Sequence, residues 1–259
     1  MKTLSWPPSD LESTKIVGKH VFYKEETSST QEDLHSLALQ GAEDGTVVVA
    51  DYQHAGRGRG GRKWIAPKGC CLLFSWLARF QTPLEFAARI TMITSLAAVR
   101  TLNEIGIEAG IKWPNDLTVR GRKIFGVLTE TSTGRSGIDF AVVGVGLNVN
   151  IDTSEMPEEV RRIATSVSEE IGKPASRGDL LADLLTNLDE LYFELRSGWN
   201  PLQEWRSRLE TIGKTVSITL GDGTVVRGIA EGVGEHGELI LTKETGAPER
   251  IWSGLIQEL

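Results

Sequence analysis

The stretch QHAGRGRGGRKW, residues 53–64, is the most distinctive segment of the sequence, with four glycines, three arginines and one lysine in twelve residues. The chain as a whole is acidic, with a formal net charge of -7. Glycines let a backbone reorganise and approach a ligand closely, and arginines bind phosphate or carboxylate through a fork of donors. The segment predicts a flexible flap that closes on a small anionic ligand. An exposed basic loop and a nucleic-acid-binding arm are the alternatives.

Two phosphate-binding motifs are excluded by their surroundings. Gly56, Gly58 and Gly61 match the spacing G-x-G-x-x-G, but this dinucleotide fingerprint must open a helix. Here Trp64 and the residues after it lead into another predicted strand. The segment IGKT, residues 212–215, has Arg208 where a P-loop needs its first glycine.

Hydrophobic patterning on both sides of the loop alternates between strand and helix periods. In the helix that begins at SSTQ, Ser29 or Thr30 is expected as the N-cap and Gly41 as the stop. Cys70 and Cys71 are adjacent in a predicted buried strand and are expected to be free thiols. The expected elements are strands at residues 20–26, 45–53, 70–77, 110–119, 122–133 and 137–150, helices at 28–41 and 84–106, and a mostly helical region at 155–210.

From about Gly213 the sequence pattern changes from helical spacing to short alternating strands separated by hairpin turns, including GDG at residues 221–223. This pattern predicts a small β-barrel packed on a larger body of helices and strands. We therefore expect an α+β protein in three parts: a loose lead-in at residues 1–18, the main domain at residues 19–210 and the small β-barrel domain at residues 211–259.

A second charged segment follows the long predicted helix. The run KWPNDLTVRGRKIFGVLTE, residues 112–130, places Lys112, Asn115, Asp116 and Lys123 around one strand pair. Charges beside a buried sheet need partners or ligands, because an unpaired buried charge is costly. This run therefore marks the second half of the predicted site.

Together these segments resemble the biotin–protein ligase family. The resemblance rests on five motifs in order: TSSTQ (27–31), DYQHAGRGRGGRKW (51–64), KWPND (112–116), RKIFGVLTE (122–130) and VVGVGLNVN (142–150). It continues into the carboxy-terminal strands and covers nearly the whole chain from His20 onward. Two positions depart from the family pattern: Gly60 stands where a bulky residue is common, and His54 where a second glutamine is common.

The resemblance implies a fold and a reaction. The fold is a mixed β-sheet flanked by helices, like the catalytic domain of class II aminoacyl-tRNA synthetases, followed by a small SH3-like β-barrel. The main domain would bind biotin and ATP with Mg²⁺ and form biotinyl-5′-AMP. Biotin would then pass to one lysine of a biotin carboxyl carrier protein domain, in acetyl-CoA carboxylase or a related biotin-dependent carboxylase. A lipoate or octanoate ligase or transferase on the same fold is the nearest alternative.

The resemblance also assigns roles to residues. Lys123, Lys112, Arg59 and Asp116 would be catalytic, with Arg59 retaining the intermediate and Asp116 orienting or deprotonating the carrier lysine. No protein cluster would bind a metal directly, since Mg²⁺ would arrive with ATP. The biotin-binding residues would be Ser29, Thr30, Gln31, Gln53, Arg57, Gly58, Arg59 and Lys123. The adenylate-binding residues would be Arg57, Arg59, Arg62, Trp64, Lys112, Asn115, Lys123 and Asn148, with the segment 162–168 on the adenine side.

Composition and length bear on the cellular location and on the partners that we expect. With no apolar run long enough to span a bilayer and no signal-peptide pattern, we expect a cytoplasmic protein with no membrane partner. About 18 residues precede the first predicted strand, too few for the DNA-binding winged helix of many relatives, so no DNA partner is expected. The resemblance leaves room for a homodimer. Rivals from other classes are a nucleic-acid-binding regulator using the arginine loop and an inactive interaction module.

Overall fold

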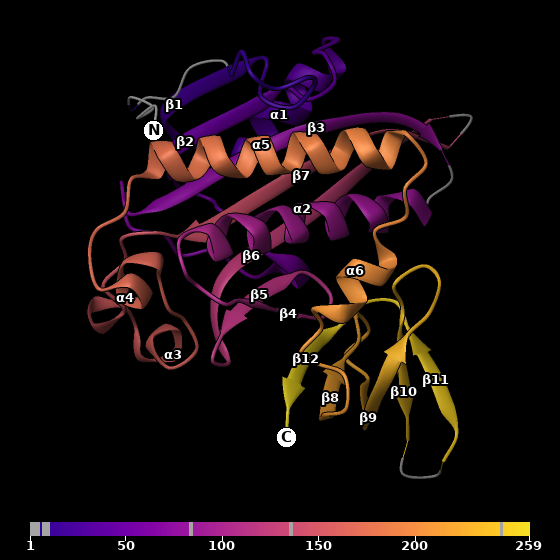
Figure 1. Ribbon diagram of the computed structural model, residues 1–259. Helices are drawn as coiled ribbons and strands as arrows, with labels where there is room; N and C mark the ends of the chain where they lie inside the picture. Colours follow the sequence, from indigo (N-terminus) through magenta and orange to yellow (C-terminus); the bar gives the residue numbers. More distant parts are fainter. Residues whose placement is uncertain (1–5, 7–10, 83–84, 135–136, 244–245) are drawn as a thin grey trace.

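The structure is a computed structural model that describes residues 6, 11–82, 85–134, 137–243 and 246–259. Its main body is a seven-stranded sheet (Figure 1). Only the pair β1–β2 is parallel, and every other neighbouring pair among the described strands is antiparallel, so the sheet is mixed as predicted. The strands lie in the order β1 (Val21–Thr27), β2 (Val47–Gln53), β3 (Cys71–Thr82), β7 (Gly137–Asn148), β6 (Arg122–Gly134), β5 (Asp116–Val119) and β4 (Gly110–Lys112).

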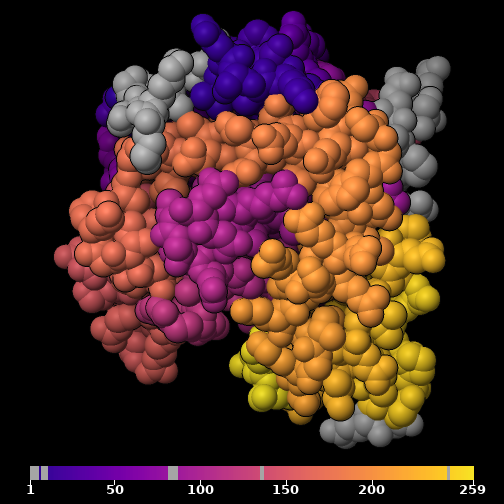
Figure 2. All heavy atoms as spheres, in the orientation of Figure 1, coloured from indigo at the N-terminus to yellow at the C-terminus, as the bar shows by residue number. Residues whose placement is uncertain are grey.

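Two long helices, α2 (Glu85–Glu104) and α5 (Arg177–Arg196), pack together over one face of this sheet (Figures 1 and 2). Helix α1 (Thr30–Leu39) packs on strands β2, β3 and β7. Alternate residues of β7 show that these are opposite faces, since Val143 joins the main core and Val142 joins Leu34 of α1. The sheet is therefore buried on both faces where helices cover it.

Shorter elements complete the main body, one of them between β2 and β3 and the others after β7. They are the 3₁₀ turns η1 (Arg59–Gly61) and η2 (Thr153–Glu155) and the helices α3 (Glu158–Arg161), α4 (Val167–Ile171) and α6 (Leu202–Ser207). None of the helices in the described ranges is long and apolar enough to cross a membrane.

The segment before β1 is not loose where the structure describes it, contrary to expectation. The backbone N–H groups of Lys15, Ile16 and Val17 all donate to the carboxylate of Asp189 on α5, at 2.6–2.8 Å. Val17 is fully buried. A buried carboxylate that accepts several backbone N–H groups is well satisfied, and so it fixes the segment to the helix.

Five antiparallel strands form the second sheet, below the main body in Figure 1. Their order is β11 (Pro248–Ile251), β10 (Leu239–Thr242), β9 (Val225–Val233), β8 (Thr215–Thr219) and β12 (Leu255–Glu258). Trp113 connects the main body to the second sheet. Its indole N–H donates to the carbonyl of Gly237, between β9 and β10, at 2.9 Å, and its backbone N–H donates to Oγ1 of Thr211, just before β8, at 3.0 Å.

Both cysteines are free, as predicted, but they differ in exposure. Cys71 is fully buried, whereas Cys70 is half-buried, because the strand begins only at Cys71. Burial raises the pKa of the Cys71 thiol to about 12. A thiol held neutral in this way is a packing group rather than a nucleophile.

Candidate active site

A cavity of about 590 Å³ lies over the face of the main sheet that carries α1. Residues from the glycine–arginine loop, the strands β5, β6 and β7, the segment 160–164 and the strand β12 line it. This part of the sheet lies beyond the residues that α1 covers, because Val142 packs under α1 while Gly144 and Gly146 reach the cavity. The cavity therefore occupies the stretch of the sheet that the helix leaves open.

Glycines form the floor of the cavity. A Cβ atom at Gly146 would lie 2.5 Å from the Trp64 ring, and one at Gly144 would lie 2.7 Å from the Gln31 side chain. At Gly126, on the neighbouring strand, a Cβ atom would lie 3.1 Å from both Asp116 Oδ1 and Lys123 Nζ. The motif VGVGLN thus removes side chains where functional groups and a ligand must approach the backbone.

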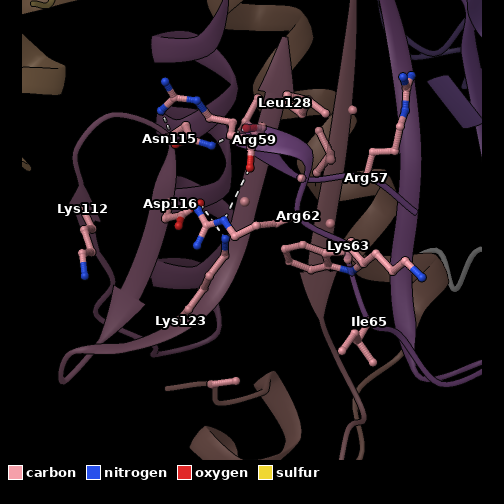
Figure 3. A pocket seen from close by; sticks show the side chains of 18 of the residues that line it. Arg57, Arg59, Arg62, Lys63, Ile65, Lys112, Asn115, Asp116, Lys123 and Leu128 are labelled. Atoms are coloured by element: carbon pink, nitrogen blue, oxygen red, sulfur yellow. Dashed lines mark hydrogen bonds and ion pairs between the residues drawn. The ribbon is translucent and has the colours of Figure 1, made fainter. Parts of the chain in front are cut away.

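Lys123 pairs with the Asp116 carboxylate in the centre of the cavity, and Arg59 and Arg62 line the same cavity (Figure 3). Lys123 Nζ lies 2.7 Å from Asp116 Oδ1. Arg59 donates to Asn115 Oδ1 at 3.0 Å, and Arg62 extends toward the Lys123–Asp116 pair (Figure 3). The sequence placed these residues in two separate motifs, and the fold brings them into one cavity.

The charges at this centre do not balance. Burial lowers the pKa of the Arg59 guanidinium, the nearby Asp116 carboxylate opposes this shift, and Arg62 adds to it by repulsion. A desolvated cation next to another cation gains from an anionic partner. The cavity is therefore built to accept a negatively charged ligand.

The KWPND segment holds its polar residues rigidly. The Asn115 side chain donates to the Val127 carbonyl at 2.5 Å, and Val127 N–H donates back to the Asn115 carbonyl at 3.0 Å. Asp116 begins β5 and pairs in register with Gly126 of β6. The carboxylate is thus fixed on a strand rather than on a free turn, which suits a group that must act in a defined direction.

The end of the cavity near α1 is neutral and polar. Gln53 Oε1 accepts from the Thr30 backbone N–H at 2.8 Å and from its hydroxyl at 3.1 Å, and that hydroxyl also lies 2.8 Å from Ser75 Oγ. Gln31 donates to the Leu128 carbonyl at 3.1 Å. Ser29 occupies the N-cap position, but its side chain makes no capping bond. The alternative cap, Thr30, instead bonds across to β2 and β3.

The glycine–arginine loop forms an ordered hairpin in this structure. Gly58 N–H donates to the Arg62 carbonyl at 2.7 Å, and Trp64 N–H donates to the Gly56 carbonyl at 2.9 Å. Gly60 has φ = 65°, a conformation that favours glycine. This explains why a bulky residue is absent there.

Two predicted site residues lie away from the cationic centre. Arg57 pairs with Glu130 Oε2 at 2.9 Å and points away from Lys123 (Figure 3). Lys112 borders the cavity, but its side chain extends on the far side of the Asp116 strand (Figure 3). Both residues would have to reorient to touch a ligand at the centre.

Asn148 fixes the opposite wall. Its amide donates to the Thr165 carbonyl at 2.9 Å, so it holds the segment 160–165 against the end of β7. Trp64 packs at the floor, with Lys123 Nζ 5.2 Å from its ring centre, a cation–π distance. Ile163 on this wall is 60% exposed, which leaves an apolar surface at the cavity mouth.

Several residues of the site were not expected from the sequence. Ser75 of β3 and Glu130 of β6 lie behind the cavity lining and hold the predicted polar residues in place. Leu255 and Gln257 reach the cavity from β12 of the second sheet, and a Cβ atom at Gly60 would lie 3.7 Å from Leu255. No local signal identifies them, because each depends on a contact between segments far apart in the chain.

Comparison with known proteins gives the family. The model of the biotin/lipoate A/B protein ligase family matches residues 23–148, and the model of the biotin protein ligase C-terminal domain matches residues 211–257. The bifunctional ligase/repressor BirA of Bacillus subtilis is 34% identical over 247 residues, which span 94% of this chain and 75% of that protein. The chain belongs to the biotin/lipoate A/B protein ligase family.

Other members of this family are similar over most of their length. The biotin–[acetyl-CoA-carboxylase] ligase of Mycobacterium tuberculosis is 34% identical, over 83% of this chain and 80% of its own. The structure of the biotin protein ligase of Aquifex aeolicus in complex with biotin and ATP superimposes with a TM-score of 0.78 and 31% identity, covering 93% of this chain and 99% of that chain. The α+β fold predicted from the sequence is confirmed.

Proposed function

We propose that this protein is a biotin–[acetyl-CoA-carboxylase] ligase, which activates biotin with ATP and transfers it to a lysine of a carrier protein. The observation that carries the proposal is the convergence of Arg59, Arg62 and Lys123 beside Asp116 over a floor of glycines. An acyl-adenylate needs close backbone approach along its length and cations at its phosphate. The names of the relatives from M. tuberculosis and A. aeolicus support biotin as the acid.

The polar end of the cavity suits the head of biotin. Thr30, Gln53 and Ser75 form a hydrogen-bonded group there, with Ser29, Gln31 and the backbone at Gly58 nearby on the lining. A ureido ring offers both donors and acceptors, which such side chains can match. With the head at this end, the valeryl chain would run beside the Gln31 and Trp64 side chains, which cover Gly144 and Gly146, and bring the carboxylate toward Lys123.

The cationic centre suits the first half-reaction. A biotin carboxylate oxygen attacks the α-phosphorus of ATP, the bond to the leaving oxygen breaks, and pyrophosphate departs with its electron pair. Lys123, Arg59 and Arg62 offset the charge of two approaching anions. Mg²⁺ bound with ATP would reduce the phosphate charge further. The described residues hold no group of three or more His, Cys, Asp or Glu side chains that could bind a metal, so Mg²⁺ would rest mainly on the phosphates.

The far end of the cavity suits the adenine ring. Trp64, Asn148 and the wall at residues 160–164 supply flat and apolar surface beside the phosphate centre. Lys112 lies at the edge of the cavity, where rotation of its long side chain would carry the cation toward the phosphates, and we assign it to ATP. Arg57 shares Glu130 with Gln31 at the polar end, so its side chain belongs with the acid.

Asp116 is the group we assign to the second half-reaction. The carrier lysine has a reference pKa of about 10.4 and must lose a proton before its amine attacks the acyl carbon. Its nitrogen then bonds to the biotinyl carbon, the bond from that carbon to the phosphate oxygen breaks, and AMP leaves. Asp116 lies on rigid strand β5 within the cavity and can accept that proton.

Replacing Asp116 by alanine should therefore slow transfer to the carrier by about 100-fold, with a smaller effect on adenylate formation. Single-turnover transfer from preformed adenylate and pyrophosphate exchange measure the two steps separately. Asp222→Ala, in a turn of the second sheet, is the control for loss of a carboxylate. An equal loss in both half-reactions would remove Asp116 from the role of base.

The family description leaves lipoate as an alternative acid, and one experiment separates the two. The protein is incubated with MgATP and either labelled biotin or labelled lipoate, and adenylate is separated by chromatography. We expect adenylate from biotin. Adenylate formed from lipoate alone would show that biotin is not the substrate. Adenylate formed from neither acid would show that the proposed ligase function is wrong.

The relatives support a biotin carboxyl carrier protein as the partner. We propose that the carrier belongs to acetyl-CoA carboxylase or a related biotin-dependent carboxylase. We also propose a cytoplasmic location, where ATP and this carrier are available together. The homodimer and the absence of a DNA partner stay predictions from the sequence.

A further inference from the structure

Glu170 on the short helix α4 is a buried carboxylate with three partners. Its side chain is 3% exposed. One oxygen accepts from Arg122 at 2.9 Å and from the Thr165 hydroxyl at 2.6 Å, and the other oxygen bonds to Arg120. A buried carboxylate is retained only when its charge and lone pairs are satisfied, and here three donors from two segments satisfy them.

These two segments enclose the backbone of Lys123. Lys123 N–H donates to the Ile163 carbonyl at 2.6 Å, and Thr165 N–H donates to the Lys123 carbonyl at 2.9 Å, so the segment 163–165 pairs with Lys123 as a short parallel strand. Arg120 lies in the hairpin turn just before Lys123, and Arg122 begins β6 directly after that turn. Glu170 therefore ties that turn to the segment that pairs with Lys123.

The turn that Glu170 contacts has a backbone conformation that few residue types adopt. Arg120 has φ = 50° and Gly121 has φ = 78°, so both central residues of the turn between β5 and β6 have positive φ. Hairpins of this kind favour asparagine and glycine, and arginine is uncommon there. The bond from Arg120 to Glu170 holds the arginine in this conformation.

We propose that Glu170 is a positioning residue for the nucleotide half of the site. It keeps Ile163 and Ala164 paired with the Lys123 backbone. The apolar wall and the Lys123 ammonium group can then contact the same bound nucleotide. This inference rests on the proposed function for its choice of ATP. The polar end at Thr30, Gln53 and Ser75 lies on α1, β2 and β3, so binding of the acid depends on Glu170 only through Lys123, whereas the nucleotide also meets the wall at Ile163 and Ala164.

Kinetics of Glu170→Gln test the proposal, because glutamine keeps the shape and removes the charge. The KM for ATP should rise about tenfold, while the Kd for biotin alone, from calorimetric titration, should rise about threefold at most. The difference is expected because Lys123 meets both ligands, whereas the wall at Ile163 and Ala164 meets only the nucleotide. Glu25→Gln on β1 is the control, since it removes a carboxylate from an exposed ion pair with Lys68, away from this wall. Equal increases in the KM for ATP and the Kd for biotin would overturn the proposal, as would no change in either.

Hydrogen exchange provides a readout independent of activity. The amides of Lys123 and Thr165 should lose protection by at least tenfold in Glu170→Gln without ligands, while those of β7 keep theirs. Unchanged protection would refute the positioning role even if the enzyme assay failed for every variant. If the wild type forms no adenylate but Glu170→Gln still lowers the protection of Lys123 and Thr165, the proposed function is wrong. The role of Glu170 in holding these two segments together would then still stand.

Arg122→Gln, whose side chain is 38% exposed, covers the case in which Glu170→Gln fails to fold. It should raise the KM for ATP in the same direction by a smaller factor. In the double variant with Glu170→Gln its effect should be less than multiplicative, because the two residues share one ion pair, although Arg122 also lies 3.6 Å from Glu169. Fully multiplicative effects would show that the two residues act separately.

Discussion

Replacing Lys123 by methionine is expected to reduce adenylate formation by about 1,000-fold, the largest effect of any single substitution proposed for this protein. Methionine retains much of the length of the side chain but cannot stabilise the negative charge that develops when carboxylate and phosphate meet. The ammonium group lies 2.7 Å from Asp116, whereas the other two lysines that line the cavity, Lys63 and Lys112, extend away from that point (Figure 3). Pyrophosphate exchange at saturating biotin and ATP measures the loss.

Lys63→Met is the matched control for this substitution. Lys63 also lines the cavity, but its side chain extends away from the Lys123–Asp116 pair (Figure 3). We expect the Lys63 variant to retain activity within about threefold, because a charge exposed to solvent is screened. Comparable losses in the two variants would mean that general positive charge, rather than the position of Lys123, drives the reaction.

The second largest effect is expected for Arg59→Ala, which should release the adenylate about 100-fold faster than wild type. Arg59 is a desolvated cation that bonds to Asn115 across the cavity, so its loss both removes an anion partner and detaches the loop from the KWPND segment. The released adenylate would then acylate lysines of unrelated proteins. Formation of adenylate should fall much less than its retention.

Two measurements check this result. Labelled adenylate is trapped on the protein, and its loss is followed over time by rapid gel filtration, while serum albumin added to the reaction reports stray biotinylation. Arg227→Ala, an exposed arginine on β9 of the second sheet, is the control and should resemble wild type in both. Retention of the adenylate by the Arg59 variant for as long as by wild type would exclude the loop from this role.

Local patterns predicted most of the elements. The helix expected at residues 84–106 is α2 at Glu85–Glu104, and the strand expected at 122–133 is β6 at Arg122–Gly134. Such segments are long and strongly periodic, so the face that becomes buried is already marked by spacing alone. The stretch 110–119 was expected as one strand, but it divides into β4 and β5 around the WPN turn, because proline favours a turn there.

The arrangement of side chains within the site could not be predicted in the same way. Arg57 and Arg59 are two residues apart in one loop, yet one pairs with Glu130 and the other with Asn115. Ser29 and Thr30 were equal candidates for the helix cap, and neither side chain caps the helix. In each case the outcome depends on which partner another strand presents at bonding distance.

By itself, the sequence determined the family, the mixed sheet and the two charged motifs, because repeating local patterns and ordered motifs are properties of the chain. Only the tertiary structure decided that Lys123 meets Asp116 over bare glycine backbone, that β12 closes one side of the cavity, and that Asp189 fixes the segment before β1. These depend on contacts between residues distant in the chain. Such contacts form only when burial of the shared core offsets the entropy of bringing the segments together.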